Sequence, residues 1–238
     1  MISTPILTAG AGLLFAIDLT FNDAAITRLP EWTVVKIGLV TALAYVTGQL
    51  IAGLSSLLLE HWLARRILRD PVSLQLNFTE PRRREWVVGK YVVGRYYEAL
   101  PPAVREKVLR LCAKGLETAP GGCGPAQVDD IFQWCFARAR QSSDAAARLG
   151  EFLKLYGFNR NVALVGLIAA LLFLSRATLT GEVNFFLWSG LSLVIAFGCL
   201  TRFLKFYAAY SAEVLRGCRI EGPAKTAPTA SSHGPEDF

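Results

Sequence analysis

Apolar residues fall into four blocks along the chain, separated by polar segments. The blocks at residues 37–59 and 183–201 contain no charged residue, and the block at 161–179 contains only Arg176. A helix of about 20 mostly apolar residues is long enough to cross the hydrocarbon core of a bilayer. The fourth block, residues 3–21, is interrupted by Asp18. The pattern predicts a mainly α-helical, polytopic membrane protein with four transmembrane helices in two hairpins, 1–59 and 160–201.

The first block has an alternative interpretation as a cleaved signal peptide. A signal peptide begins with a basic region ahead of its apolar stretch. No Lys or Arg precedes residue 21, so we expect a retained membrane helix over residues 3–21.

Composition and charge support the membrane interpretation. Hydrophobic residues make up 53% of the chain and charged residues only 18%, whereas about a quarter of the residues in soluble domains are charged. The net charge of +6 comes largely from basic residues beside the apolar blocks. Those singled out are Arg65, Arg66, Arg69, Arg82, Arg83, Arg84, Arg202 and Lys205. Basic loops face the cytoplasm and attract anionic lipids, which explains these positions better than a nucleic-acid partner does. We therefore expect a multi-pass protein of the bacterial inner (plasma) membrane, with both termini in the cytoplasm.

The segment 60–159 is long enough for a small cytoplasmic domain, which we expect to be mostly helical. Near its start, Leu74, Leu76 and Phe78 alternate with polar residues, and β-branched and aromatic residues follow at 86–96. This pattern leaves two alternatives open for the segment, a short β-hairpin near 72–97 or a helix on the membrane surface. Helices are predicted from Pro102, from Pro125, and from Asp144 into the third apolar block. Beyond the fourth block we expect a juxtamembrane amphipathic helix over 202–221 and a disordered tail over 222–238.

Two features inside the apolar blocks are candidates for function. Asp18 and Lys36 lie near the outer ends of their predicted helices and are expected to pair across the first hairpin. Such groups can also line an ion or proton path, but snorkelling side chains are the simpler interpretation. A stripe of small residues, including Ala44, Gly48 and Ala52, predicts close packing of helices, either within one bundle or between subunits of a homo-oligomer.

No motif for catalysis, metal binding or a cofactor is recognisable in the sequence. His61 and His233 are the two histidines, and the five cysteines form no close pair of the kind that metal sites use. We therefore expect no enzyme activity, no metal and no cofactor. Two hypotheses are left. The first is a membrane protein with a partner-binding or regulatory cytoplasmic domain. The alternative is a small oligomeric channel or membrane-perturbing effector gated by that domain.

Overall fold

The chain is described by a computed structural model over residues 3–21, 34–68, 70–80, 98–117 and 123–218. Of these residues 88% are helical, and none of them forms a strand. Three helical segments are long and apolar enough to cross a membrane: Val34–Ala64, Ser143–Thr180 and Val183–Gly217. The apolar helix Pro5–Phe21 is shorter. These findings confirm a mainly helical protein compatible with a membrane location.

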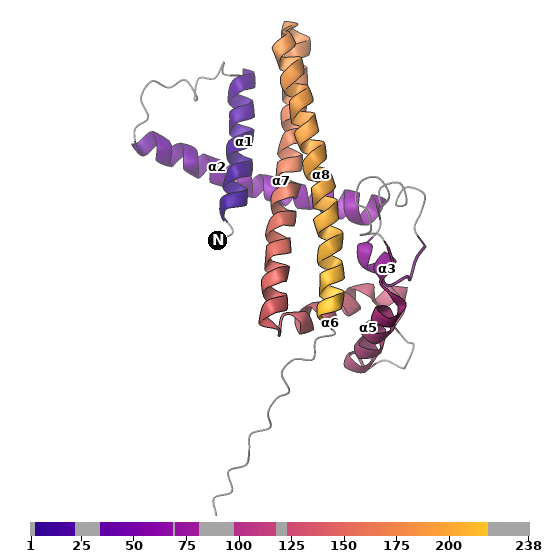
Figure 1. The fold of residues 1–238 in the computed structure, drawn as a ribbon. Helices are drawn as coiled ribbons and strands as arrows, with labels where there is room; N and C mark the ends of the chain where they lie inside the picture. Colours follow the sequence, from indigo (N-terminus) through magenta and orange to yellow (C-terminus); the bar gives the residue numbers. More distant parts are fainter. Residues whose placement is uncertain (1–2, 22–33, 69, 81–97, 118–122, 219–238) are drawn as a thin grey trace, which may run out of the picture.

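A long antiparallel hairpin forms the axis of the molecule (Figure 1). Its helices are α7, Ser143–Thr180, and α8, Val183–Gly217, of 38 and 35 residues. At 1.5 Å per residue they are about 57 and 52 Å long, so both exceed the roughly 30 Å of a hydrocarbon core. The helices approach closely at Gly166, where an added Cβ would lie 3.0 Å from the Cβ of Ala196. Gly181 ends α7 with a left-handed φ of 73°, a conformation that glycine adopts without steric cost.

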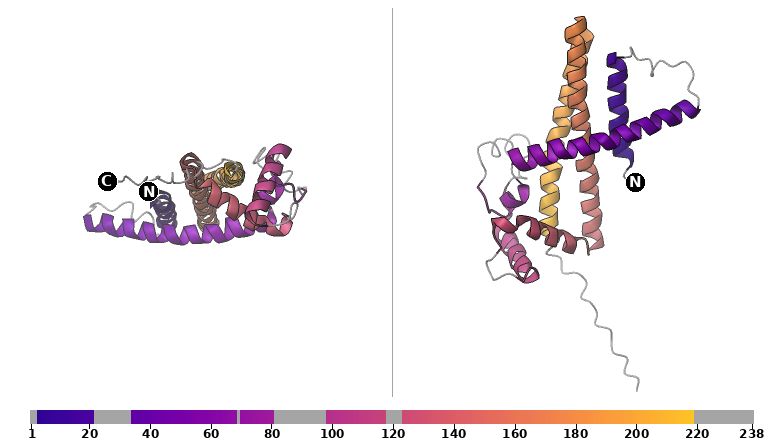
Figure 2. Two further views of the ribbon diagram at one scale, coloured as in Figure 1. Left: turned by 90° about the horizontal axis from the view of Figure 1, so that it is seen from below. Right: turned by 180° about the vertical axis from the view of Figure 1, so that it is seen from behind.

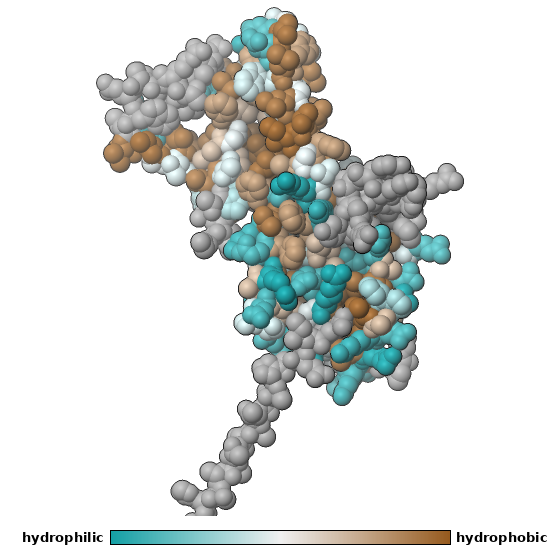
Figure 3. All heavy atoms as spheres, viewed as in Figure 1, coloured by the Kyte–Doolittle hydropathy of each residue, from teal (hydrophilic) through white to brown (hydrophobic). Residues whose placement is uncertain are grey.

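The hairpin changes character along its length. We call the half that contains the turn at Gly181 the outer half and the opposite half the inner half. In Figure 3 the outer half is covered by hydrophobic residues, while hydrophilic residues gather around the inner half. Leu187, Val194 and Phe197 are among the large apolar side chains exposed on the outer half. Apolar surface of this extent is typical of a face that contacts lipid.

The first two helices meet at a close crossing. These helices are α1, Ser3–Phe21, and α2, Val34–Ser55. A Cβ on Gly10 would overlap the Ala44 carbonyl oxygen, and one on Gly48 would overlap the Ile6 carbonyl oxygen. The small-residue stripe therefore packs within the chain.

The direction of α2 differs from the expected side-by-side hairpin. Figures 1 and 2 show α1 alongside α7, whereas α2 runs across both. The backbones of α1 and α2 touch at Gly10 and Gly48, because small residues let helices approach closely.

The chain continues from α2 into η1, Ser56–Ile67, which has π-helical hydrogen bonding. Shorter helices then gather around the inner half of α8: α3 (Pro71–Gln75), α5 (Pro102–Gly115), η4 (Pro125–Gln127) and α6 (Val128–Ala139). Their apolar faces meet α8 in one core that includes Val108, Ile131 and Val214, each 0% exposed. The same helix pair that forms the outer hairpin thus also forms the frame of this helical region.

Of the two alternatives for residues 72–97, the β-hairpin does not form over the part that the structure describes. Pro71 occupies the first turn of α3, and the backbone turns at Asn77 with a positive φ of 57°. Leu74, Gln75 and Leu76 are all buried, so the alternation of apolar and polar residues does not separate a core face from a water face. The remaining part of the predicted hairpin, residues 81–97, lies outside the described residues, as does the predicted tail.

Candidate functional site

A polar network lies where η1 crosses α7. Arg160 of α7 donates a hydrogen bond from Nη1 to Oε2 of Glu60 on η1, with an N–O distance of 2.6 Å. The Tyr156 hydroxyl, one turn earlier on α7, donates to the same Glu60 oxygen at 2.5 Å. The side chains of Arg160 and Glu60 are only 12% and 20% exposed, so the ion pair is screened little by solvent.

The network continues onto the end of α2. Arg160 Nε donates to the Ser55 hydroxyl at 3.1 Å, and that hydroxyl donates to Oδ1 of Asn161 at 2.6 Å. The Arg160 side chain also lies over the Tyr156 ring, 5.3 Å from its centroid. One guanidinium therefore joins α2, η1 and α7, and its charge is balanced by Glu60. A buried charge needs such partners, because leaving it unpaired costs several kcal/mol.

The network marks the boundary between the two halves of the hairpin. Arg160 directly precedes the apolar block 161–179 of α7, and Asn161 is the first residue of that block. Glu60 likewise directly follows the apolar stretch that ends at Leu59. The π-helical hydrogen bonding of η1 begins at Ser56, four residues before Glu60.

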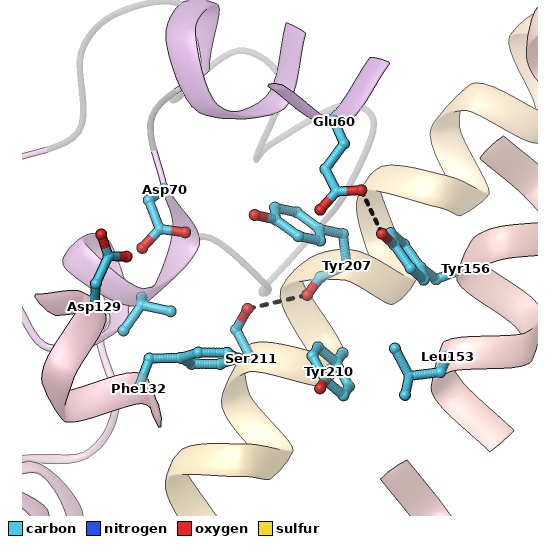
Figure 4. Close-up of a pocket in the computed structure, with 10 residues that line it drawn as sticks. Glu60, Asp70, Asp129, Phe132, Leu153, Tyr156, Tyr207, Tyr210 and Ser211 are labelled. Atoms are coloured by element: carbon cyan, nitrogen blue, oxygen red, sulfur yellow. Dashed lines mark hydrogen bonds between the residues drawn. The ribbon is translucent and has the colours of Figure 1, made fainter. Parts of the chain in front are cut away.

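A cavity of about 210 Å³ opens beside the network (Figure 4). Its walls come from η1, α6, α7 and α8 and from the segment that starts α3. The described residues that line it are Glu60, Asp70, Val72, Asp129, Phe132, Leu153, Tyr156, Tyr207, Tyr210 and Ser211. Three of these carry a carboxylate and four carry an aromatic ring. The rings pack against one another, with 5.9 Å between the centroids of Tyr156 and Tyr207 and 6.1 Å between those of Phe132 and Tyr210.

Three cysteines meet in the core of the helical region, which the sequence did not predict. Cys112, Cys135 and Cys218 come from α5, α6 and the end of α8, and all three are 0% exposed. The sulfur atoms of Cys112 and Cys135 are 3.5 Å apart. The pKa of the Cys135 thiol lies far above its ordinary value because it shares hydrogen bonds with Cys112 and Cys218 and is buried. A thiol held neutral is a poor nucleophile, so this cluster is suited to packing rather than to reaction.

The structure places the predicted site residues as follows. Arg202 and Lys205 are exposed on α8, beyond its apolar stretch. Arg65 and Arg66 belong to η1, but their side chains, like Arg69, Arg82, Arg83 and Arg84, lie outside what the structure describes. Asp18 is 1% exposed in the last turns of α1, and Lys36 is exposed in the first turn of α2. The pairing of Asp18 with Lys36 stays a prediction.

Sequence reasoning missed Glu60, Tyr156 and Arg160 because the ion pair joins residues 100 positions apart. The signal that was available is the position of Glu60 and Arg160 at the ends of apolar stretches. Within the described part of the chain, no group of three or more His, Cys, Asp or Glu side chains is arranged so that it could hold a metal ion, and this includes the three buried cysteines.

Comparison of the chain with family models, curated proteins and solved structures finds no match. The class of protein therefore rests on the fold itself. It is a mainly helical protein with three helices suited to crossing a membrane.

Proposed function

We propose that this chain is an integral membrane protein whose inner helical region is a cytoplasmic domain that binds a protein partner and transmits that event to the membrane helices. The observation that carries the proposal is the continuity of α7 and α8, which run unbroken from the apolar half of the hairpin into the core of the helical region. A change in the packing of α5 or α6 on α8 would act directly on a membrane-spanning helix, without a flexible linker between them.

The proposed topology has four membrane helices and both termini in the cytoplasm, in a bacterial inner membrane. Its support is the basic charge at the inner ends of the helices, including exposed Arg202 and Lys205. These side chains would contact anionic lipid head groups, which contribute about 1 kcal/mol per basic residue near the surface. In the arrangement of Figure 2, α2 lies across α7 at the level of Arg160. Because α2 runs across α7, a topology with four crossings requires α2 to reorient in the bilayer so that it runs alongside α7.

The channel alternative has less support. It rests on the small-residue stripe and on the direct helix connection from the helical region into the apolar half of α7. The connection fits both hypotheses equally, and the stripe packs between α1 and α2 of one chain. We therefore place partner binding first, and homo-oligomer formation through another surface stays a prediction.

The proposal is tested with a photo-crosslinking residue in the full chain, expressed in native membranes. We would place it at Lys107, exposed on α5, and at the matched control Glu182, exposed at the opposite end of the hairpin. We expect a reproducible protein adduct from position 107 and none from 182. In sealed inside-out vesicles, a single cysteine at 107 should be labelled from outside and one at 182 should not. Equal adducts at both positions, or labelling on the opposite sides, would contradict the proposal.

A further inference from the structure

The helix η1 has a face that packs against the protein and a second face that points away from it. Leu59 and Ala64 are buried in a core that η1 shares with α7 and α8. They are five residues apart, which is the hydrogen-bond spacing of a π-helix. Leu57, Leu58 and Trp62 are instead 60%, 44% and 56% exposed. We call these three side chains the outward face of η1.

The level of η1 along α7 indicates which surroundings the outward face meets. Glu60 of η1 pairs with Arg160 of α7, and Arg160 directly precedes the apolar block 161–179. At 1.5 Å per residue that block is about 29 Å long, close to the roughly 30 Å of a hydrocarbon core. In the proposed membrane, η1 therefore lies where the hydrocarbon core gives way to the head groups.

The chemistry of the outward face suits this boundary layer. Tryptophan has an apolar body and an indole N–H that needs a hydrogen-bond acceptor, and it is enriched where membranes meet water. Bulk water would leave Leu57, Leu58 and Trp62 exposed as apolar surface, whereas the hydrocarbon core would leave the indole N–H without an acceptor. The head-group layer satisfies both requirements, and it also accepts exposed His61 beside Trp62.

A hollow of about 370 Å³ lies where α2 passes into η1, and it shares Leu57 with the outward face. Its described lining residues are Gly53, Ser56, Leu57, Glu60 and His61. The lining changes along the helix, from an apolar end at Gly53 and Leu57 to a polar end at Glu60 and His61. A molecule with an apolar chain and a polar head matches this change, so the hollow favours a phospholipid over a water-soluble partner.

We propose that the outward face of η1 lies in the head-group layer of the membrane and binds phospholipid there, with Trp62 as its anchor. Because Glu60 of the same helix pairs with Arg160, this contact connects the membrane surface directly to α7. The inference rests on the membrane location proposed above, and it is independent of the protein partner.

The experiment is photo-crosslinking of the full chain in nanodiscs of phosphatidylethanolamine and phosphatidylglycerol. The photoreactive residue p-benzoylphenylalanine replaces Trp62 in one variant and Leu58 in another, so one position is left if the other substitution disturbs folding. The positive control is position Phe197, exposed on the outer half of α8, and the negative control is position Lys107, exposed on α5. Mass spectrometry detects the lipid adducts, and fragmentation locates the bond on the lipid.

We expect severalfold more lipid adduct at positions 62 and 58 than at 107, with the bond on the glycerol or the first acyl carbons, because the head-group layer presents that part of the lipid. Adduct at 197 combined with no more adduct at 62 and 58 than at 107 would overturn this proposal alone. Absence of adduct at 197 as well would contradict the membrane location itself. Bonds mainly at the ends of the acyl chains would place the outward face in the hydrocarbon core and would also overturn the proposal.

Discussion

The ion pair between Glu60 and Arg160 allows a quantitative test of how η1 is held to α7. Glu60→Gln keeps the shape of the side chain and an oxygen that can accept from Tyr156, but it removes the charge that balances Arg160. Removing one partner of a fully buried ion pair costs about 3–5 kcal/mol. The two side chains are 12% and 20% exposed, so we expect a smaller loss of unfolding free energy, about 2–3 kcal/mol.

The assay is unfolding of the purified full chain in detergent, followed by the helical signal in circular dichroism. For a chain of this size the expected loss lowers Tm by about 4–12 °C. The matched control is Glu106→Gln, which breaks an exposed pair with Arg110, the side chains being 61% and 80% exposed. Exposed pairs contribute about 0–1 kcal/mol, so the control should change Tm little.

A double-mutant cycle measures the interaction energy between Glu60 and Arg160 separately from the other contacts of each side chain. Arg160→Met leaves the Glu60 carboxylate buried without its partner, so it should cost about as much as Glu60→Gln. Combining the two changes removes both charges, and the double variant should be more stable than the sum of the single losses predicts, by at least about 1 kcal/mol. If the losses simply add, or if Glu60→Gln costs no more than Glu106→Gln, the pair does not hold the crossing.

Three further predictions concern packing and thiol reactivity. Gly10→Leu should separate α1 from α2 and cost about 1–3 kcal/mol by overpacking, seen as a lower Tm. Phe203→Ala, at a side chain that is 0% exposed, should lower the free energy of unfolding by about 3–5 kcal/mol. Phe197→Ala, at a side chain that is 61% exposed on the apolar half, should lower it little. Equal losses of unfolding free energy would contradict the assigned core. Because its pKa is raised, Cys135 should stay unlabelled by maleimide at pH 8 while partly exposed Cys123 reacts. Comparable labelling rates by mass spectrometry would contradict the burial of the thiol.

Several elements could be predicted from the sequence because their signals are local. The continuous helix from Asp144 into the third apolar block is confirmed by α7, and the helix start at Pro102 is confirmed by α5. A proline at a helix start and an apolar block of bilayer length act through a few neighbouring residues, so they can be read from a single sequence. The sequence left strand and helix open near Leu74, because alternation over so few residues does not show which side chains the rest of the chain will cover.

The sequence by itself thus determined the helical class, the apolar spans and the basic residues at their inner ends. Only the tertiary structure decided that α2 runs across α7, that Glu60 meets Arg160, and that carboxylates from η1, α6 and the start of α3 share one cavity with tyrosines of α7 and α8. The physical reason is the range of the interactions. Helix formation and membrane compatibility depend on neighbouring residues along the chain. The crossing and the cavity depend on contacts between residues about a hundred positions apart, and no local pattern specifies those partners.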